Sequence, residues 1–225
     1  PEQLATFFER AAQLSEFATD KRETCSQSSE NKRALFGALH IHTAASYDAT
    51  AFGVTNSADD AYAFSTGKTV EYRLSGDAAD AEVPSITIGR PLDFAAVTDH
   101  AGKLGERRIC LNPQSNGYNA LVCKFYRGDI ELPLDETMAP LIKLASQAIF
   151  GGNRSARVCG EGGGDCRESA QNSWLENQQA NERWYDRSSD CNFTTFHAYE
   201  YTLAVDAANL HRNVIFESAT IPPAV

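Results

Sequence analysis

Two histidines stand two positions apart at the end of an apolar run, in the segment His40-Ile41-His42. Side chains alternate along a β-strand, so both imidazoles point to one side of the strand and Ile41 points to the other. Two neutral imidazoles at this spacing are a natural pair of ligands for a divalent metal ion. The alternative is a hydrogen-bonded pair of histidines at a strand end, and the pair by itself leaves both interpretations open.

A second polar group, Thr98-Asp99-His100, closes the apolar run that begins at Asp93. An acid and an imidazole at the end of such a run are unfavourable unless they meet a cation or each other. The alternation of side chains places His100 on the side opposite Asp99. We predict that His100 is a metal ligand and that Asp99 supports catalysis by orienting a ligand from behind.

Residues 193–203 form a third apolar and aromatic run, which contains Glu200. A carboxylate in such a strand needs compensation, and a position that bridges two cations would provide it, although a salt bridge would do so too. His197 has the opposite parity to Glu200, so we expect it to lie outside the site as a surface or packing residue. His211, which shares a face with Asn213, is either a further ligand or a capping histidine at a strand start.

The combination of these groups is more specific than any one of them. Imidazoles and a carboxylate at successive strand ends predict a centre of two or three divalent ions held by nitrogen and oxygen ligands. Such a centre activates water and binds an anionic ester. The sequence therefore favours a metal-dependent hydrolase with a small anionic ester as its substrate.

These residues need a scaffold that brings strand ends together, and the hydrophobic pattern predicts one. Strands that alternate with helices indicate an α/β fold with mostly parallel strands, whose sites lie at the carboxyl ends of the strands. The predicted strands are 35–43, 93–98, 193–203 and 214–217, with a small hairpin within 69–90. The predicted helices are 3–18, 57–66 (opened by a capping box), 135–150 and 169–186. The segment 101–132 is expected to be loop-rich, and 151–166 to be a loop.

The charge and hydropathy of the chain exclude some classes of function. Its 225 residues carry 20 Lys and Arg against 30 Asp and Glu, a net charge of −10. This balance argues against binding to nucleic acid or to an anionic membrane surface. No apolar run approaches the roughly 18–20 residues of a membrane-spanning helix. A small anionic substrate remains compatible with the charge, because bound cations reverse the local field.

Six cysteines are many for a reduced cytosolic domain, and none of them forms a CxxC pair typical of a thiolate metal site. We therefore expect disulfides and an oxidising compartment, either the periplasm or the extracellular space, with buried free thiols as the alternative. Cys159 and Cys166 flank a glycine-rich segment in which a local bridge is sterically easy, so they form the preferred pair.

Three segments together resemble the opening motifs of the PHP superfamily (polymerase and histidinol phosphatase domains). They are Phe36-Gly-Ala-Leu-His40-Ile-His42-Thr43, Asp93-Phe-Ala-Ala-Val-Thr-Asp99-His100 and Phe193-Thr-Thr-Phe-His-Ala-Tyr-Glu200-Tyr-Thr202. More narrowly, the segments that begin at Cys191 and at Asn209 are similar to those of the secreted bacterial proteins grouped as DUF3604. The resemblance covers residues 34–220.

The resemblance implies a distorted seven-stranded (β/α) barrel that holds two or three zinc, manganese or iron ions and hydrolyses phosphoesters. By motif position, the residues that it implies as metal ligands are His40, His42, His100, Glu200, His211 and Asp48. Glu200 would be the bridging and catalytic carboxylate. Asp48 lies six residues after His42, where some members place another metal-binding side chain.

The chain also departs from the pattern of the PHP superfamily. Ala38 and Gly102 stand where members commonly carry acids, and later motifs would follow Val225. We therefore expect residues 34–225 to be the N-terminal portion of a PHP-like metallohydrolase domain, an incomplete barrel with loop-rich insertions, preceded by a helix and linker over 1–33. The leading expectation is a phosphoesterase. The alternatives are a non-catalytic module that binds metal or ligand, and a hydrolase of C–N or carboxylic-ester bonds.

Overall fold

The computed structural model describes residues 21–72, 74, 82–127, 129, 155–205 and 208–225. The helices predicted over residues 3–18 and 135–150 lie outside these described residues. The described part of the predicted linker, residues 21–33, contains neither helix nor strand.

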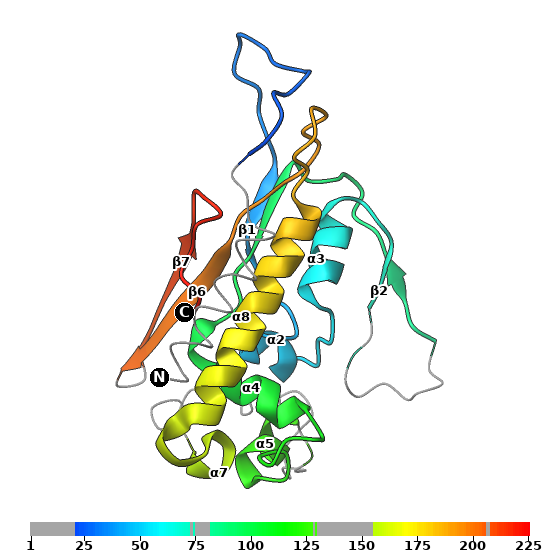
Figure 1. The fold of residues 1–225 in the computed structure, drawn as a ribbon. Coiled ribbons are helices and arrows are strands. Elements are labelled where there is room, and N and C mark those ends of the chain that lie inside the picture. The colour runs from blue at the N-terminus through cyan, green and yellow to red at the C-terminus, as the bar shows by residue number, and fades with distance from the viewer. Residues whose placement is uncertain (1–20, 73, 75–81, 128, 130–154, 206–207) are drawn as a thin grey trace.

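A three-stranded parallel sheet lies at the centre of the described fold (Figure 1). It contains, in spatial order, β1 (Gly37–Ile41), β4 (Phe94–Val97) and β5 (Thr194–Thr195). The small apolar side chains of Ala95, Ala96 and Val97 are fully buried, as expected for a short apolar strand in a parallel sheet. The predicted strands 35–43 and 93–98 are thus confirmed, within shorter bounds.

Two helices pack against this sheet, namely α3 (Ala58–Ser65) and the long α8 (Gly164–Trp184) (Figure 1). Tyr62 of α3 and Ala180 of α8 join Val97 and Phe193 in one buried apolar cluster. Both helices are predicted by the sequence, although α8 begins earlier than expected. The sheet and these two helices therefore share the core that fixes the strand ends.

The N-terminus of α3 is closed by a reciprocal capping box between Ser57 and Asp60. The Asp60 backbone N–H donates to Ser57 Oγ (3.3 Å), and the Ser57 backbone N–H donates to Asp60 Oδ2 (2.7 Å). Replacing Ser57 with Ala removes the first of these bonds, so we expect the free energy of unfolding to fall by about 1 kcal/mol. Urea unfolding measures the change, with the exposed Ser218→Ala as the control. Equal stabilities of the two variants would contradict the capping role.

A second group of helices lies around the N-terminal end of α8 (Figure 1). It consists of α4 (Leu104–Leu111), α5 (Leu121–Arg127) and α7 (Ala156–Cys159). Its core contains Ile109, Tyr126 and Val158 together with the disulfides Cys110–Cys123 and Cys159–Cys166. Two buried disulfides thus fill the part of this core that larger apolar side chains fill in other proteins.

The segment 101–132, expected to be loop-rich, contains two helices that the sequence pattern does not predict, α4 and α5. The expected loop 151–166 also contains α7 and, at its end, the first turn of α8. Helices of this length contain about two turns, too few to give a clear 3.6-residue repeat of apolar positions. The two disulfides of this helix group stabilise these short helices. The pattern of apolar residues in the sequence does not reveal this stabilisation.

Close contact between α4 and α8 depends on Gly105. A Cβ atom added at this glycine would lie 1.9 Å from the backbone oxygen of Cys166. The two helix backbones can approach this closely only because residue 105 has no side chain. The contact fixes the start of α4, and with it the short segment that connects α4 to the end of β4.

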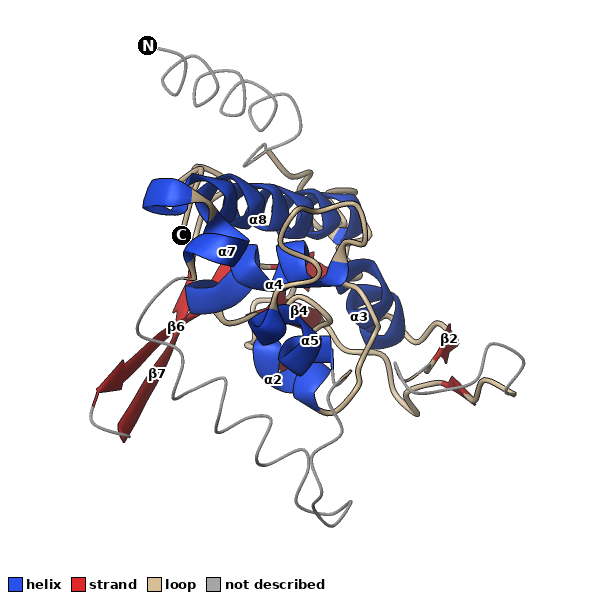
Figure 2. Ribbon diagram, turned by 90° about the horizontal axis from the view of Figure 1, so that it is seen from below, coloured by secondary structure: helices blue, strands red, loops and turns tan. Residues whose placement is uncertain are grey.

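Two antiparallel ribbons project from opposite sides of the body (Figure 2). The longer one contains β6 (Ala198–Val205) and β7 (Ala208–Ile215), and the shorter one contains β2 (Val70–Glu71) and β3 (Ser85–Ile86). The hairpin predicted within 69–90 is confirmed. The strand predicted over 193–203 is instead two strands, β5 and β6, and β7 is longer than the predicted 214–217.

The described strands do not close into a barrel. β1 and β5 are the edges of the parallel sheet, and β6 joins it only through an isolated parallel bridge between His100 and Glu200. The described part is a mixed α/β fold with one three-stranded parallel sheet and six α-helices. The expectation of mostly parallel strands holds for the central sheet alone, and the incomplete (β/α) barrel stays a prediction.

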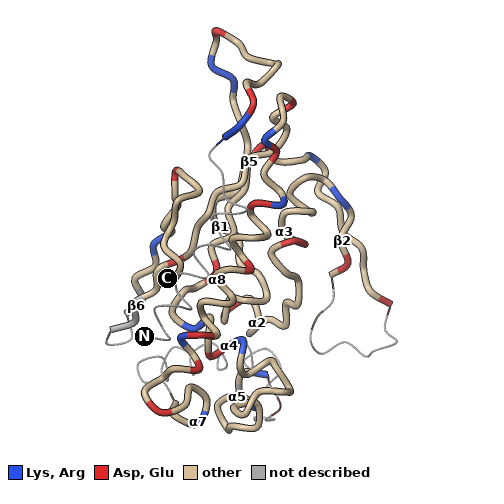
Figure 3. The backbone as a smooth tube through the Cα atoms, in the orientation of Figure 1, with Lys and Arg blue, Asp and Glu red and all other residues tan. Residues whose placement is uncertain are grey.

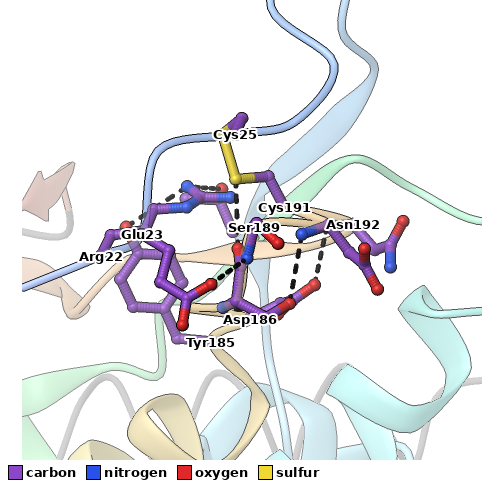
Figure 4. Close-up of a disulfide and its surroundings, with 11 residues drawn as sticks. Arg22, Glu23, Cys25, Tyr185, Asp186, Ser189, Cys191 and Asn192 are labelled. Atoms are coloured by element: carbon purple, nitrogen blue, oxygen red, sulfur yellow. Dashed lines mark hydrogen bonds between the residues drawn. A yellow bond between two sulfur atoms is a disulfide. The ribbon is translucent and has the colours of Figure 1, made fainter.

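All six cysteines are paired, as Cys25–Cys191, Cys110–Cys123 and Cys159–Cys166. The last pair is the one predicted from the sequence. The first ties the segment before β1 to the loop after α8, where Glu23 accepts a hydrogen bond from the Ser189 backbone N–H (2.9 Å; Figure 4). Three disulfides fit an extracellular or otherwise oxidising environment.

Acidic and basic side chains are interspersed along the described chain (Figure 3). Neither sign of charge is therefore confined to one block of the described chain. None of the described helices is long and apolar enough to cross a membrane.

Candidate metal centre

The ends of three strands converge at one point of the structure. β5 and β6 run beside β4 and its continuation in the same register, since Phe94 pairs with Thr194 and His100 pairs with Glu200. β1 lies on the other side of β4, with an irregular register in its second half. The end of β1, the segment that follows β4 and the first half of β6 therefore lie next to one another.

Glu200 is at the centre of the cluster. Its Oε2 atom lies 2.8 Å from Nε2 of His42 and 3.4 Å from Nε2 of His40. The same atom lies 3.3 Å from Nδ1 of His100, and Oε1 lies 2.9 Å from Nδ1 of His211. One carboxylate thus meets four imidazoles, which come from the end of β1, the segment after it, the segment after β4, and β7.

Asp48, in α2 (Tyr47–Ala51), supplies a second carboxylate. Its Oδ2 atom lies 2.6 Å from Nδ1 of His42 and 3.4 Å from Nε2 of His100. These two imidazoles therefore lie between Asp48 and Glu200, each with one ring nitrogen toward each carboxylate. The Ser46 hydroxyl donates to Asp48 Oδ1 (2.6 Å), which fixes the orientation of the Asp48 side chain.

The centre is buried at one end and open at the other. The side chains of Glu200 and His100 are 3% and 4% exposed, whereas those of His40 and His211 are 60% and 34% exposed. A molecule from solvent can therefore reach the cluster from the side of His40 and His211.

The surroundings keep Asp48 ionised. Burial by itself would raise the pKa of Asp48, but hydrogen bonds with His100, His42 and Ser46 outweigh it and hold the pKa well below its usual value. Burial would likewise lower the pKa of His42, whereas the hydrogen bond with Asp48 and the charges of Asp48 and Glu200 raise it. An ionised carboxylate at neutral pH is the state that a metal ion requires of such a ligand.

Three overlapping sets of side chains offer ligand atoms that lie within 4.8 Å of one another. The sets are His40, His42 and Glu200; His42, Asp48 and His100; and His100, Glu200 and His211. The Nε2 atoms of His40 and His42 lie 3.0 Å apart, and the buried Oε2 of Glu200 has no well-directed hydrogen bond among the described residues. Both features fit lone pairs that are directed at a shared cation rather than at each other. The residues present therefore fit a metal centre.

Asp99 points away from this centre, on the side that the alternation predicts. Its carboxylate accepts hydrogen bonds from the backbone N–H (2.6 Å) and the hydroxyl (2.7 Å) of Thr43. Burial raises the pKa of Asp99 to about 6, against the effect of the two bonds from Thr43. Asp99 thus orients the backbone next to His42 and does not touch an imidazole. Its role in catalysis stays a prediction.

Three residues around His100 are missing from the sequence-based set. Thr202 Oγ1 lies 2.5 Å from Nδ1 of His100, and the ring of Tyr47 stacks on the imidazole with centroids 4.3 Å apart. Ser46 Oγ accepts a hydrogen bond from the His100 backbone N–H (3.3 Å). Thr202 could have been found, because it lies two residues after Glu200 on one strand and shares its face. Tyr47 and Ser46 depend on the path of a loop and give no such signal.

Two other groups with metal-binding residue types lie outside the centre. His197 is buried, with its Nε2 2.7 Å from Glu182 Oε1, so it is a packing residue and not a surface one. Glu106 lies near Cys159 and Cys166. The two sulfur atoms are joined in a disulfide, and this group therefore offers no thiolate ligand.

One known protein family matches nearly the whole chain. The sequence model of the family described as "Protein of unknown function (DUF3604)" matches residues 29–224. The matched range includes every residue of the centre. Comparisons with curated proteins and with solved structures give no match.

Proposed function

The chain belongs to the DUF3604 family of proteins of unknown function, and we propose that it is a metal-dependent phosphoesterase related to the PHP hydrolases. In this proposal the substrate is a small anionic phosphoester. The protein acts in the periplasm or the extracellular space, which agrees with its three disulfides.

One observation carries the proposal: the buried carboxylate of Glu200 lies among four histidine side chains. A buried carboxylate is normally offset by a few hydrogen bonds or by one cation. Four imidazoles are more than one buried carboxylate needs to offset its charge. Asp48 places a second carboxylate beside two of these imidazoles, those of His42 and His100. Nitrogen and oxygen donors in this proportion suit zinc, manganese or iron, and the three overlapping ligand sets would hold two or three such ions.

Divalent ions bound by these residues would lower the pKa of water towards about 7 and stabilise negative charge on the phosphoryl oxygens. Glu200 and Asp48 would offset the charge of the ions. Thr202 and Tyr47 hold the ring of His100 at its edge and on its face. His40 and His211 border the open side, from which the substrate enters.

The test of this proposal is metal content measured together with turnover. We expect the full chain, purified without a chelator, to retain divalent metal and to hydrolyse p-nitrophenyl phosphate or bis(p-nitrophenyl) phosphate. Exhaustive chelation should lower the rate by a factor of about 100 or more, because activation of water and stabilisation of charge would both be lost. Addition of Zn²⁺ or Mn²⁺ should restore the rate. An unchanged rate after chelation would contradict the proposal.

Two other results would assign a different function to the same centre. Stoichiometric metal without turnover of any ester would make the chain a non-catalytic metal-binding module. Metal-dependent cleavage of amides or carboxylic esters, without cleavage of phosphoesters, would make it a hydrolase of those bonds. Either result would overturn the phosphoesterase proposal and leave the metal centre in place.

A further inference from the structure

A cavity of about 450 Å³ lies between α3, α4 and α8, and we refer to it as the helix cavity. Its volume falls within the range of pockets that bind small molecules. Asp99 lines it, so it lies on the Asp99 side of the strand end, and none of the six residues of the metal centre lines it. Leu104 and Leu111 give it an apolar wall, and polar side chains from α8 form the opposite wall.

Arg107 of α4 brings a buried positive charge to the helix cavity. The residue is 2% exposed, and its Nε donates to the backbone oxygen of Ala44 (3.1 Å). Its buried Nη1 has no hydrogen-bond partner among the described residues. Burial lowers the pKa of Arg107 to about 10, so the guanidinium is still charged at neutral pH. A buried, incompletely paired guanidinium is unfavourable, and an anion with two oxygens is its natural partner.

The other charged groups of the helix cavity already have partners. Arg183 forms an ion pair with Asp59 (2.6 Å), and Arg108 forms one with Glu176. Asp99, as described above, uses both of its carboxylate oxygens to accept hydrogen bonds from Thr43. The charge of Asp99 acts on Arg107 and partly offsets it, but Nη1 of Arg107 still has no hydrogen-bond acceptor among the described residues. Arg107 is therefore the charged group of this cavity that can still donate to a bound anion.

A second polar atom of the helix cavity also lacks a partner. Oδ1 of Asn177, on α8, is buried and accepts no hydrogen bond from the described residues. A buried acceptor without a donor is unfavourable. A molecule that pairs with Arg107 and also offers an N–H or O–H group would satisfy both sites at once.

We infer that the helix cavity binds a small organic anion that carries a hydroxyl or amino group near its carboxylate or phosphate. The charged group pairs with Arg107, the hydroxyl or amino group donates to Asn177, and the carbon skeleton lies against Leu104 and Leu111. This site is separate from the metal centre and does not depend on the proposed phosphoesterase activity.

The experiment is an NMR titration of the ¹⁵N-labelled full chain with three probes. Butyrate and 3-hydroxybutyrate differ by one hydroxyl group, and inorganic phosphate represents the other type of oxyanion. We expect 3-hydroxybutyrate to shift the backbone amides of residues 104–112 and 173–180, and to bind up to about tenfold more tightly than butyrate, the value of one hydrogen bond. Shifts of the same amides by phosphate alone would support the site and assign it to phosphate compounds.

Two variants test the residues that define the site. Arg107→Met should weaken binding of the shifting probe by at least about tenfold, because it removes a charge-assisted hydrogen bond. Asn177→Leu should leave the affinity for butyrate unchanged and abolish the preference for 3-hydroxybutyrate, a result that does not depend on the folding of the first variant. The matched control is Arg157→Met, which removes an exposed arginine of α7.

Two results would overturn the inference. One is the absence of shifts at residues 104–112 and 173–180 with every probe. The other is binding at these residues that neither Arg107→Met nor Asn177→Leu changes relative to Arg157→Met.

Discussion

Replacing Glu200 with Gln should remove most of the metal that we propose the protein binds and, with it, the proposed hydrolytic activity. Glutamine has nearly the same shape, but it has no charge and presents one oxygen in place of the two that now meet four imidazoles. Loss of a residue that merely supports a ligand weakens metal binding by about 10- to 100-fold. Loss of the central carboxylate should therefore weaken it by about 100-fold or more. Elemental analysis after dialysis and the rate of p-nitrophenyl phosphate hydrolysis measure the two effects.

The chain offers a closely matched control for this substitution. Glu182 also has a side chain that is only 7% exposed and is paired with a histidine, His197, but it lies outside the metal centre. Glu182→Gln should leave the metal content unchanged, even if it lowers the stability of the fold. Equal metal content in Glu200→Gln and Glu182→Gln would remove Glu200 from the ligand set.

Removing the disulfide Cys25–Cys191 should lower the free energy of unfolding by about 5 kcal/mol in the chain-entropy model. The bridge spans 166 positions of sequence and therefore restricts most of the unfolded chain. The double variant Cys25→Ser, Cys191→Ser leaves the two other disulfides in place, and guanidinium unfolding compares it with the unaltered protein. Both cysteines are only half-buried, so the substitution leaves no large cavity.

Ser189→Ala is the control for this prediction, because it alters the same loop without breaking the covalent link. It should unfold as the unaltered protein does. A double cysteine variant that unfolds at the same denaturant concentration as Ser189→Ala would show that the bridge does not stabilise the fold. The predicted difference is a large fraction of the total stability of a typical domain.

The candidate centre could largely be predicted because its residues follow a simple rule of strand geometry. Alternation along a strand separates His100 from Asp99 and Glu200 from His197, and the structure places each of these four as that rule requires. The rule also covers Thr202, whose partner on β7 is His211. Side chains held by a loop, such as Tyr47, follow no period, and only coordinates reveal them.

The fold was harder to predict, for reasons that concern particular segments. The run 193–203 reads as one strand, but the chain changes partners after Thr195, from β4 to the antiparallel β7. A change of partner leaves the apolar pattern unaltered, so the pattern cannot locate it. Helices α4 and α5 are short and are joined by the disulfide between Cys110 and Cys123. The spacing of apolar residues along the sequence does not reveal such a link.

The three disulfides form closed rings of very unequal size, and the two small rings lie inside the large one. Cys110–Cys123 and Cys159–Cys166 join positions 13 and 7 apart, whereas the outer pair joins positions 166 apart. If the chain enters an oxidising compartment with its N-terminus first, both inner disulfides can form before the residues beyond 166 have entered. Because the rings are nested and no pair crosses another, neither early bond blocks the outer one. Cys25 can pair only after Cys191, the last cysteine, has entered the oxidising compartment. Formation of the outer disulfide would therefore show that nearly all of the chain up to Glu200 has entered it.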